Sequence, residues 1–337
     1  MGSKISGKLV RNMISNVVRT KLGKEPIKPI FVTYYTNISC NAACTYCNYV
    51  TNGATKNQSR LSTDKTLQLM GIVKKSVPNI YFTGGEPLLR PDIEEVTRGT
   101  KDLGFKIIGL NSNMSLIDKR QGLLDDITQL VASYDTNSIE KNSQLWGVTK
   151  KFAERVKENI VTCAGLQDEK DYTMTLNCVV TPDSIPEAHD VLDFCKEHGI
   201  QFAIVPAELK GGQFNPELKD NPKYKELISR VLDEKRGGAP VFGSRKYFET
   251  ISEFKDFRCF PLLTPHIDHE GHLHYPCQTL GKRTSSSILE LGSLEKAIEQ
   301  GEEEHGGIPS CGNICHKACY IGPSIVVQNP FRAMDSL

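Results

Sequence analysis

Three cysteines near the start of the chain have the spacing of a metal-cluster loop. Cys40, Cys44 and Cys47 form a C-x3-C-x2-C run directly after a stretch of strand-forming residues. Three thiolates on one short loop can bind three irons of a four-iron cubane, and the fourth iron then stays open to another ligand. A zinc site usually takes two C-x2-C pairs, whereas this run contains one. The spacing therefore favours an iron–sulfur cluster, with a zinc site and buried structural thiols as alternatives.

A glycine-rich turn follows the second predicted strand. It reads Thr83-Gly84-Gly85-Glu86-Pro87. Two adjacent glycines let a ligand approach the backbone closely, and exposed backbone groups can bind an amino acid moiety. The Glu86 carboxylate could accept a hydrogen bond from an ammonium group. Taken alone, the string is compatible with an ordinary turn; after the cysteine run, a ligand site is favoured.

The elements that must position these residues alternate along the chain. Strands are expected at residues 30–36, 79–82, 106–110, 127–133, 172–180 and 201–207. Helical patterns between them include residues 63–75, 149–166 and 184–198. About six strand–helix units predict a parallel sheet with helices outside it. Active sites on such sheets lie at the carboxyl ends of the strands, which is where both motifs fall.

The two motifs, in this order, resemble the radical S-adenosylmethionine (SAM) superfamily. The resemblance covers residues 30–207 and rests on the cysteine run, with an aromatic residue before Cys47, and on Thr83-Gly-Gly-Glu-Pro-Leu-Leu. It implies an α/β fold, a partial (β/α)6 TIM-type barrel with SAM and its cluster inside the open mouth. It also implies that Cys40, Cys44 and Cys47 ligate a [4Fe-4S] cluster.

The chemistry implied by this resemblance uses SAM as a radical source. One electron from the reduced cluster cleaves SAM to methionine and a 5′-deoxyadenosyl radical, which abstracts hydrogen from a substrate or adds to it. The resemblance assigns the methionine end of SAM to Gly84, Gly85 and Glu86, and the adenine to the backbone of Tyr46. Further SAM contacts are expected from residues near the ends of the third, fourth and fifth strands, namely Ser112, Asn113, Ser133 and Asn177.

A second group of cysteines lies in the last part of the chain. Its members are Cys259, Cys277, Cys311, Cys315 and Cys319. A hairpin between the first two, followed by later cysteines, resembles the SPASM/twitch extension of radical SAM enzymes. The resemblance implies one auxiliary [4Fe-4S] cluster, held by Cys259, Cys277 and two of the last three. The C-x3-C-x3-C spacing departs from the family pattern and leaves that choice open, and a structural zinc is the alternative.

Four histidines crowd the same hairpin, at positions 266, 269, 272 and 274. We interpret them as a polar hairpin face rather than as a metal site, because His272 and His274 alternate onto one side of a strand. Three other cysteines stand alone in apolar surroundings and are expected in the core, namely Cys163, Cys178 and Cys195.

Composition limits the remaining possibilities. The 337 residues include 41 basic and 40 acidic side chains, and a net charge of +1 gives no reason to expect nucleic-acid binding. No apolar run approaches a membrane span, and no signal peptide is visible. We therefore expect a cytoplasmic protein with reduced thiols, and the resemblance implies flavodoxin or ferredoxin as electron donor. Four parts are predicted: a basic helix over 1–28, the barrel over 29–209, a linker with helices over 210–256, and the auxiliary-cluster domain over 257–337.

Residues 4–24 predict a basic amphipathic helix. Its apolar residues recur at helical spacing, at Ile5, Leu9, Val10, Met13, Ile14 and Val17. Such a helix either binds an anionic membrane surface or packs against the barrel. With a loose similarity of residues 315–323 to lipid-modifying radical SAM enzymes, it favours a hydrophobic or lipid-like substrate. A SPASM-type peptide maturase or a small-molecule dehydrogenase is the runner-up, and a non-catalytic iron–sulfur or zinc module is the alternative from another class.

Overall fold

Parallel strands follow one another across one sheet in the order in which they occur in the chain. The computed structural model describes residues 6–47, 59–209, 211–309, 311 and 315–330. The sheet has eight strands in the order β6-β5-β4-β3-β2-β1-β7-β8. Their bounds are β1 Val32–Tyr35, β2 Asn79–Thr83, β3 Ile107–Ser112, β4 Gln129–Ser133, β5 Thr173–Val180, β6 Gln201–Pro206, β7 His266–Ile267 and β8 Leu273–His274.

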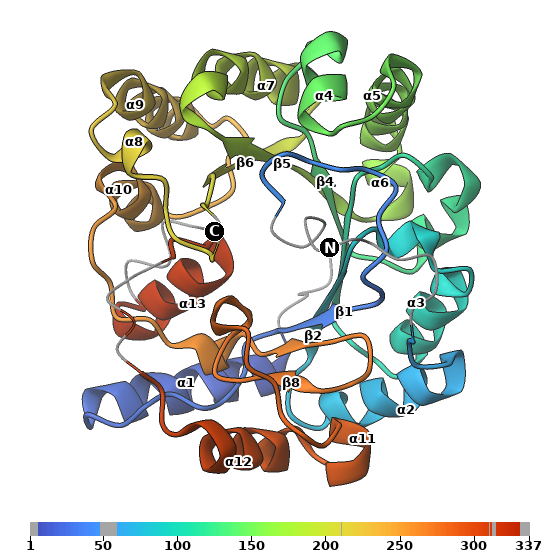
Figure 1. The fold of residues 1–337 in the computed structure, drawn as a ribbon, viewed down its shortest axis with the longest axis vertical. Helices are drawn as coiled ribbons and strands as arrows, with labels where there is room; N and C mark the ends of the chain where they lie inside the picture. Colours follow the sequence, from blue (N-terminus) through green and yellow to red (C-terminus); the bar gives the residue numbers. More distant parts are fainter. Residues whose placement is uncertain (1–5, 48–58, 210, 310, 312–314, 331–337) are drawn as a thin grey trace.

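Helices surround the sheet on its outer side (Figure 1). The larger ones are α1 Gly7–Lys21, α2 Thr63–Lys74, α3 Ile93–Asp102, α4 Ile139–Leu145, α5 Lys150–Gly165, α7 Ile185–Glu197, α9 Pro222–Arg236, α10 Arg245–Glu253, α12 Leu294–His305 and α13 Ala318–Gln328. Short helices are α6 Gln167–Lys170, α8 Pro216–Lys219 and α11 Ile288–Leu291. In the described residues the sheet stays open between β6 and β8, as a partial barrel requires. The expected α/β fold is confirmed.

Local sequence signals start several of these helices. The Ser62 hydroxyl accepts a hydrogen bond from the Lys65 N–H at the start of α2. The Thr149 hydroxyl does the same for the Phe152 N–H at the start of α5. These N-cap bonds satisfy backbone donors that the helix itself leaves unpaired. The boundaries expected from such residues agree with the structure to within a residue or two.

The two faces of the sheet differ in chemistry. Side chains that point to the helices are apolar and fully buried, for example Phe82, Leu110 and Leu176. The alternate positions point inward and most of them are polar; several are only partly buried, for example Asn111, Gln129 and Asn177. Helix packing on the outer face therefore stabilises the sheet and leaves a polar inner face. Cys163, Cys178 and Cys195 lie buried on the helix side, as their apolar surroundings predict.

The late part of the chain extends the sheet next to its first strand. β7 pairs in parallel with β1, with Thr33 opposite His266 and Tyr34 opposite Ile267. β8 then pairs antiparallel with β7. The hairpin predicted from residues 260–276 is present, and its two strands belong to the same sheet as the barrel.

The most deeply buried side chains of the first helix are polar, whereas its apolar Leu9, Met13 and Val17 are only partly buried. Asn12 and Asn16 are its buried residues. Val10 and Ile14, expected on the packing side or on a membrane, are exposed. Ile5 lies outside the described residues. No helix among the described residues has both the length and the apolar character needed to cross a bilayer.

Candidate functional site

The first cysteine group lies at the carboxyl end of β1. Cys40, Cys44 and Cys47 are unpaired and partly exposed. Burial raises the pKa of Cys40 to about 11, and the charges of Glu86 and Cys47 add to that effect. Burial, followed by the charges of Asp135, Cys47 and Cys40, raises the pKa of Cys44 to about 12. The neighbouring thiols are therefore close enough to oppose the ionisation of Cys40 and Cys44, and bound iron cations would reverse that effect. This donor set fits the cluster that the motif predicts.

Gly84 and Gly85 pack directly against the stem of the cysteine loop. A methyl group added at Gly84 would lie 2.3 Å from the Asn37 carbonyl oxygen, and one at Gly85 would lie 2.1 Å from the Ser39 carbonyl oxygen. The Gly85 N–H donates to Asn37 O at 3.1 Å, and the Glu86 N–H donates to Ser39 O at 2.7 Å. The two glycines are thus required for contact between the second loop and the first.

The Glu86 carboxylate points into the protein and is 1% exposed. Its Oε1 accepts hydrogen bonds from Ser112 Oγ at 2.8 Å and from the Leu88 N–H at 3.0 Å. Its Oε2 accepts from the Asn113 N–H at 2.7 Å. Burial raises the pKa of Glu86 to about 7 despite these donors. Both oxygens already have protein partners, so Glu86 connects the ends of β2 and β3.

Asn113 reaches from the end of β3 to the cysteine loop. Its Nδ2 donates to Asn41 Oδ1 at 2.8 Å and lies 4.0 Å from Cys40 Sγ. Asn41 in turn donates to Ser115 Oγ at 2.9 Å. The structure therefore brings Glu86, Ser112 and Asn113 together beside the first cysteine.

Tyr46, in the cysteine loop, is held by residues that follow β4. Its hydroxyl donates to Asp135 Oδ2, directly after β4. Trp146 Nε1 donates to the same oxygen at 2.8 Å, and the Val179 N–H donates to Asp135 Oδ1 at 2.9 Å. The backbone of the loop is also bound here, because the Ala43 N–H donates to Trp146 O at 2.8 Å. Burial raises the pKa of Asp135, and of Tyr46 as well.

The site predicted from sequence did not include Asp135 or Trp146. Two signals were available, since Asp135 follows a strand end in a parallel sheet and Trp146 is the sole tryptophan of the chain. Ser133 and Asn177, which were predicted, lie opposite each other on β4 and β5 at partly exposed inward positions.

The second cysteine group also comes together in space. Burial raises the pKa of Cys259, and the next contributions are the charges of Cys315, Cys311, Cys277 and Cys319. The five cysteine sulfurs therefore lie close together next to β8 and α13. A [4Fe-4S] cluster takes four cysteine ligands, so one of the five would not be needed. No three described His, Cys, Asp or Glu side chains are arranged to bind a single metal ion. A cubane spreads its cysteine ligands over different irons and requires no such convergence.

Several buried polar atoms on or next to the strands lack hydrogen-bond partners. His266 and His274 stand opposite each other on β7 and β8. His266 Nδ1 lies 3.2 Å from the Tyr35 hydroxyl, whereas its Nε2 is buried without a hydrogen-bond partner. Asn111 Oδ1 and Glu208 Oε1 are also buried and unpartnered. Burial lowers the pKa of His266 to about 3, so its imidazole is neutral. His272, in contrast, binds the Thr284 carbonyl through Nδ1 at 2.8 Å.

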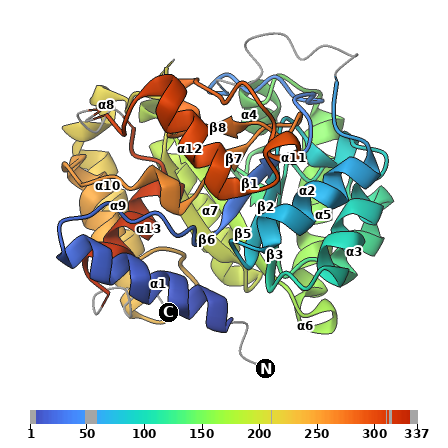
Figure 2. The same cartoon turned by 90° about the horizontal axis from the view of Figure 1, so that it is seen from below.

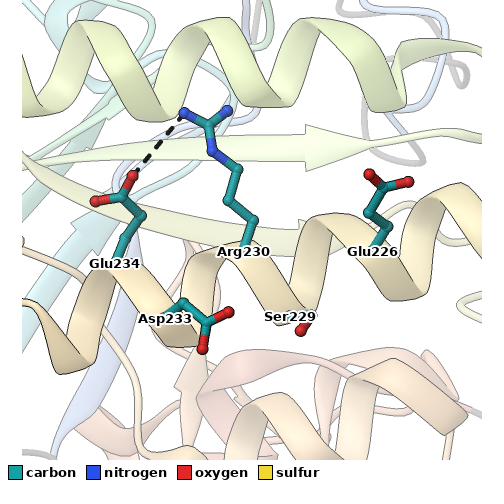
Figure 3. A pocket seen from close by; sticks show the side chains of 5 residues that line it. All are labelled: Glu226, Ser229, Arg230, Asp233 and Glu234. Carbon is teal, nitrogen blue, oxygen red and sulfur yellow. Dashed lines mark ion pairs between the residues drawn. The ribbon is translucent and has the colours of Figure 1, made fainter.

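A hollow lies along α9 (Figure 3). All its lining residues come from this one helix, namely Glu226, Ser229, Arg230, Asp233 and Glu234. The Arg230 guanidinium is already paired with Asp193 and with Glu234, the latter at 4.0 Å. This hollow contributes nothing to the cysteine site.

These features define a class of enzyme, an open α/β barrel with a three-cysteine cluster loop at the carboxyl ends of its strands. The sequence profile of the radical SAM superfamily matches residues 34–195. The chain therefore belongs to the radical SAM superfamily and is an enzyme of that type.

Several known proteins are similar to the chain. A probable GTP 3′,8-cyclase of Methanocaldococcus jannaschii is 27% identical over 77% of this chain and 87% of its own length. An AdoMet-dependent heme synthase of Oleidesulfovibrio alaskensis is 25% identical over 58% of this chain and 50% of its own length. Among solved structures, Streptococcus suis SuiB bound to S-adenosylmethionine has a TM-score of 0.64 at 19% identity, covering 91% of this chain and 76% of SuiB. Native anSMEcpe with bound AdoMet has a TM-score of 0.61 at 18% identity, covering 85% and 88%.

Proposed function

We propose that Cys40, Cys44 and Cys47 hold a [4Fe-4S] cluster with SAM, and that the resulting radical acts on a polar, uncharged substrate such as a peptide. When bound, the cluster supplies the electron that converts SAM to methionine and a 5′-deoxyadenosyl radical. The second cysteine group, Cys259, Cys277 and two of Cys311, Cys315 and Cys319, would hold an auxiliary cluster. We further propose that this chemistry runs in the reducing cytoplasm with flavodoxin or ferredoxin as electron donor.

The residues around the first cysteines have positioning roles in this proposal. Asp135 fixes Tyr46, and Glu86 fixes the Asn113 backbone, so the loop is held between β2, β3 and β4. Ser133 and Asn177 present side chains to the inner face, where they can bind the polar parts of SAM. Gly84 and Gly85 keep the loop close, and the backbone carbonyls beside them remain candidates for the SAM ammonium group.

The inner face of the sheet carries the argument for a polar substrate. Within the eight described strands, most inward positions hold Tyr, Thr, Ser, Asn, Gln or His, the others hold Gly, Ala, Val or Ile, and none holds Lys, Arg, Asp or Glu. His266 Nε2 and Asn111 Oδ1 are left without partners there. Unpaired buried polar atoms are costly, so they are expected to pair with a ligand.

A hydrophobic or lipid-like substrate, expected from the first helix and residues 315–323, is not supported. An apolar substrate would leave these polar atoms unpaired and desolvated. None of the similar proteins named above is named for a lipid either. Two of the structures similar in fold contain peptides. SuiB bound to its precursor peptide SuiA matches this chain with a TM-score of 0.62, and anSMEcpe with the Cp18Cys peptide matches it with a TM-score of 0.58.

GTP is the second candidate substrate. It is favoured by the match to the probable GTP 3′,8-cyclase, which covers 87% of that protein. A triphosphate carries several negative charges, which proteins neutralise with Lys and Arg side chains. The inward strand positions supply none, so we rank GTP below a peptide.

The experiment compares two substrate pools under anaerobic conditions. The reconstituted enzyme receives SAM and dithionite, together with GTP, with a peptide fraction of cell extract, or with the same fraction after protease digestion. 5′-Deoxyadenosine is measured by mass spectrometry, and a Cys40→Ala variant gives the background. We expect the intact peptide fraction to stimulate its formation and digestion to remove the stimulation. Stimulation by GTP alone would reverse the ranking, and no product above the Cys40→Ala background would refute the radical chemistry.

A further inference from the structure

An apolar stripe runs along the outer side of α1. Val10, Ile14, Val18 and Leu22 recur every four residues and are 44%, 61%, 50% and 68% exposed. Spacing of four places them above one another on a single helix face. α1 lies along the edge of the molecule in Figure 2, and the exposed fractions show that the stripe is open to solvent. Four aliphatic side chains in one row are more than the scattered apolar residues of an ordinary surface.

Specific polar contacts fix which way α1 faces. Asn12 Nδ2 donates to Pro29 O at 2.9 Å and to Ser76 O at 3.1 Å. Asn16 Nδ2 donates to Lys28 O at 2.7 Å, and Asn16 Oδ1 accepts from the Lys28 N–H at 3.0 Å. The two carboxamides thus bind the backbone that leads into β1 and β2. Because they occupy the inner face, the aliphatic row cannot turn toward the core.

The charged side chains of α1 and of the turn after it, up to Lys24, are all basic. Arg11, Lys21 and Lys24 are exposed. Residues 6–24 contain no acidic side chain. Glu25, the first acidic residue after α1, is paired with Arg258 at 2.6 Å. The surface is therefore an aliphatic row with a cationic border.

We propose that α1 docks on an anionic membrane surface, with the stripe among the acyl chains and the Lys and Arg side chains at the headgroups. An apolar face bordered by basic residues is the composition of interfacial helices. A second copy of the chain would bring two cationic borders together, and a single row of four side chains is small beside a stable protein interface. This docking is independent of the substrate and of the radical chemistry.

Vesicle flotation of the full-length reconstituted enzyme tests the docking. One set of vesicles contains phosphatidylcholine alone, and the other also contains phosphatidylglycerol. We expect flotation with the anionic vesicles, release by high salt, and little flotation with the neutral ones. Ile14→Glu is expected to reduce flotation about tenfold, because it places a carboxylate in the middle of the stripe. Val161→Glu is the matched control, since Val161 is 39% exposed on α5.

The outcomes separate this docking from its competitors. Absence of flotation with anionic vesicles, or equal loss in Val161→Glu, would refute it. Concentration-dependent dimers in sedimentation velocity that disappear in Ile14→Glu would assign the stripe to a second copy instead. SAM cleavage without added substrate should be the same in both variants and the parent. A failure of the radical chemistry would therefore appear in that assay and not in flotation.

Discussion

Tyr46 donates its phenolic hydrogen bond to the buried carboxylate of Asp135, and this bond joins the cysteine loop to the end of β4. The two residues are 89 positions apart in the chain. The cysteine loop is therefore fixed by tertiary contacts, and those contacts can be tested without knowledge of the substrate.

Removing the Tyr46–Asp135 bond should loosen the loop. Tyr46→Phe and Asp135→Asn are each expected to destabilise the protein by about 1–3 kcal/mol, because a buried polar group loses a partner. The double variant should show a coupling free energy of about 0.5–3 kcal/mol. Urea unfolding of the metal-free protein measures both quantities. Strictly additive effects would show that the two side chains do not interact.

Gly85→Ala should abolish retention of the first cluster, the one proposed for Cys40, Cys44 and Cys47. The added methyl group would meet Ser39 O at 2.1 Å, and a backbone oxygen cannot move away as a flexible side chain can. Overpacking of this kind costs about 1–3 kcal/mol and displaces the cysteine loop. Bound iron and the unfolding free energy are the measurements. Gly71→Ala is the control, because nothing lies within 4 Å of the added group on α2, and it should be neutral or slightly stabilising.

The raised pKa of Glu86 predicts a specific pH dependence of stability. The folded-state pKa of about 7 lies above the ordinary glutamate value of 4.5. The folded state therefore binds more protons between these values, and the contribution of Glu86 to stability declines as pH rises through that window. The full effect is up to about 3 kcal/mol. Glu86→Gln removes this titration. Between about pH 5 and about pH 8, the parent should therefore lose stability relative to the variant as the pH rises. A constant difference across this range would contradict the shifted pKa.

His266→Phe should separate stability from substrate use. The apolar ring removes the unpartnered Nε2 but also the Nδ1 partner of the Tyr35 hydroxyl, so we expect a loss of stability of no more than about 1–3 kcal/mol. Stimulation of 5′-deoxyadenosine formation by substrate should fall, while SAM cleavage without substrate remains. His189→Phe, on the half-buried outer side of α7, is the control and should leave stimulation intact. A large loss of stability in His266→Phe would instead indicate a structural role.

Iron content should identify the auxiliary ligands. The reconstituted parent is expected to hold about eight irons, and Cys277→Ala about four. Of Cys311→Ala, Cys315→Ala and Cys319→Ala, two should lose about four irons and one should keep them all. Cys163→Ala should lose none, because Cys163 lies in the core. Four irons in the parent itself would show that no auxiliary cluster is present.

Local sequence patterns predicted the strands and helices well because each depends on its own residues. The orientation of α1 could not be predicted in this way. Its apolar periodicity suggests a buried aliphatic face, whereas Asn12 and Asn16 determine the packing through carbonyls of Lys28, Pro29 and Ser76. Those acceptors exist only after the barrel has formed.

In the candidate site, too, local motifs could be predicted from sequence and long-range contacts could not. The cysteine spacings and the Gly-Gly-Glu-Pro string carry their chemistry in adjacent residues. The partners of Glu86 at the end of β3 and those of Tyr46 at the end of β4 are long-range contacts. Sequence indicated that Glu86 matters but could not show that both of its carboxylate oxygens face the protein.

The pairing of β7 with β1 has a consequence for how the enzyme is assembled. β1 leads into the first cysteine loop, yet in the part of the chain that the structure describes one of its edges pairs with residues 265–267, more than 200 positions later. During synthesis this edge stays open until nearly the whole chain has left the ribosome, and an open edge can pair with other strands. Early insertion of the first cluster would therefore occur on an unfinished sheet. We expect chains truncated before β7 to aggregate through β1, even though every residue matched by the radical SAM profile is present in them.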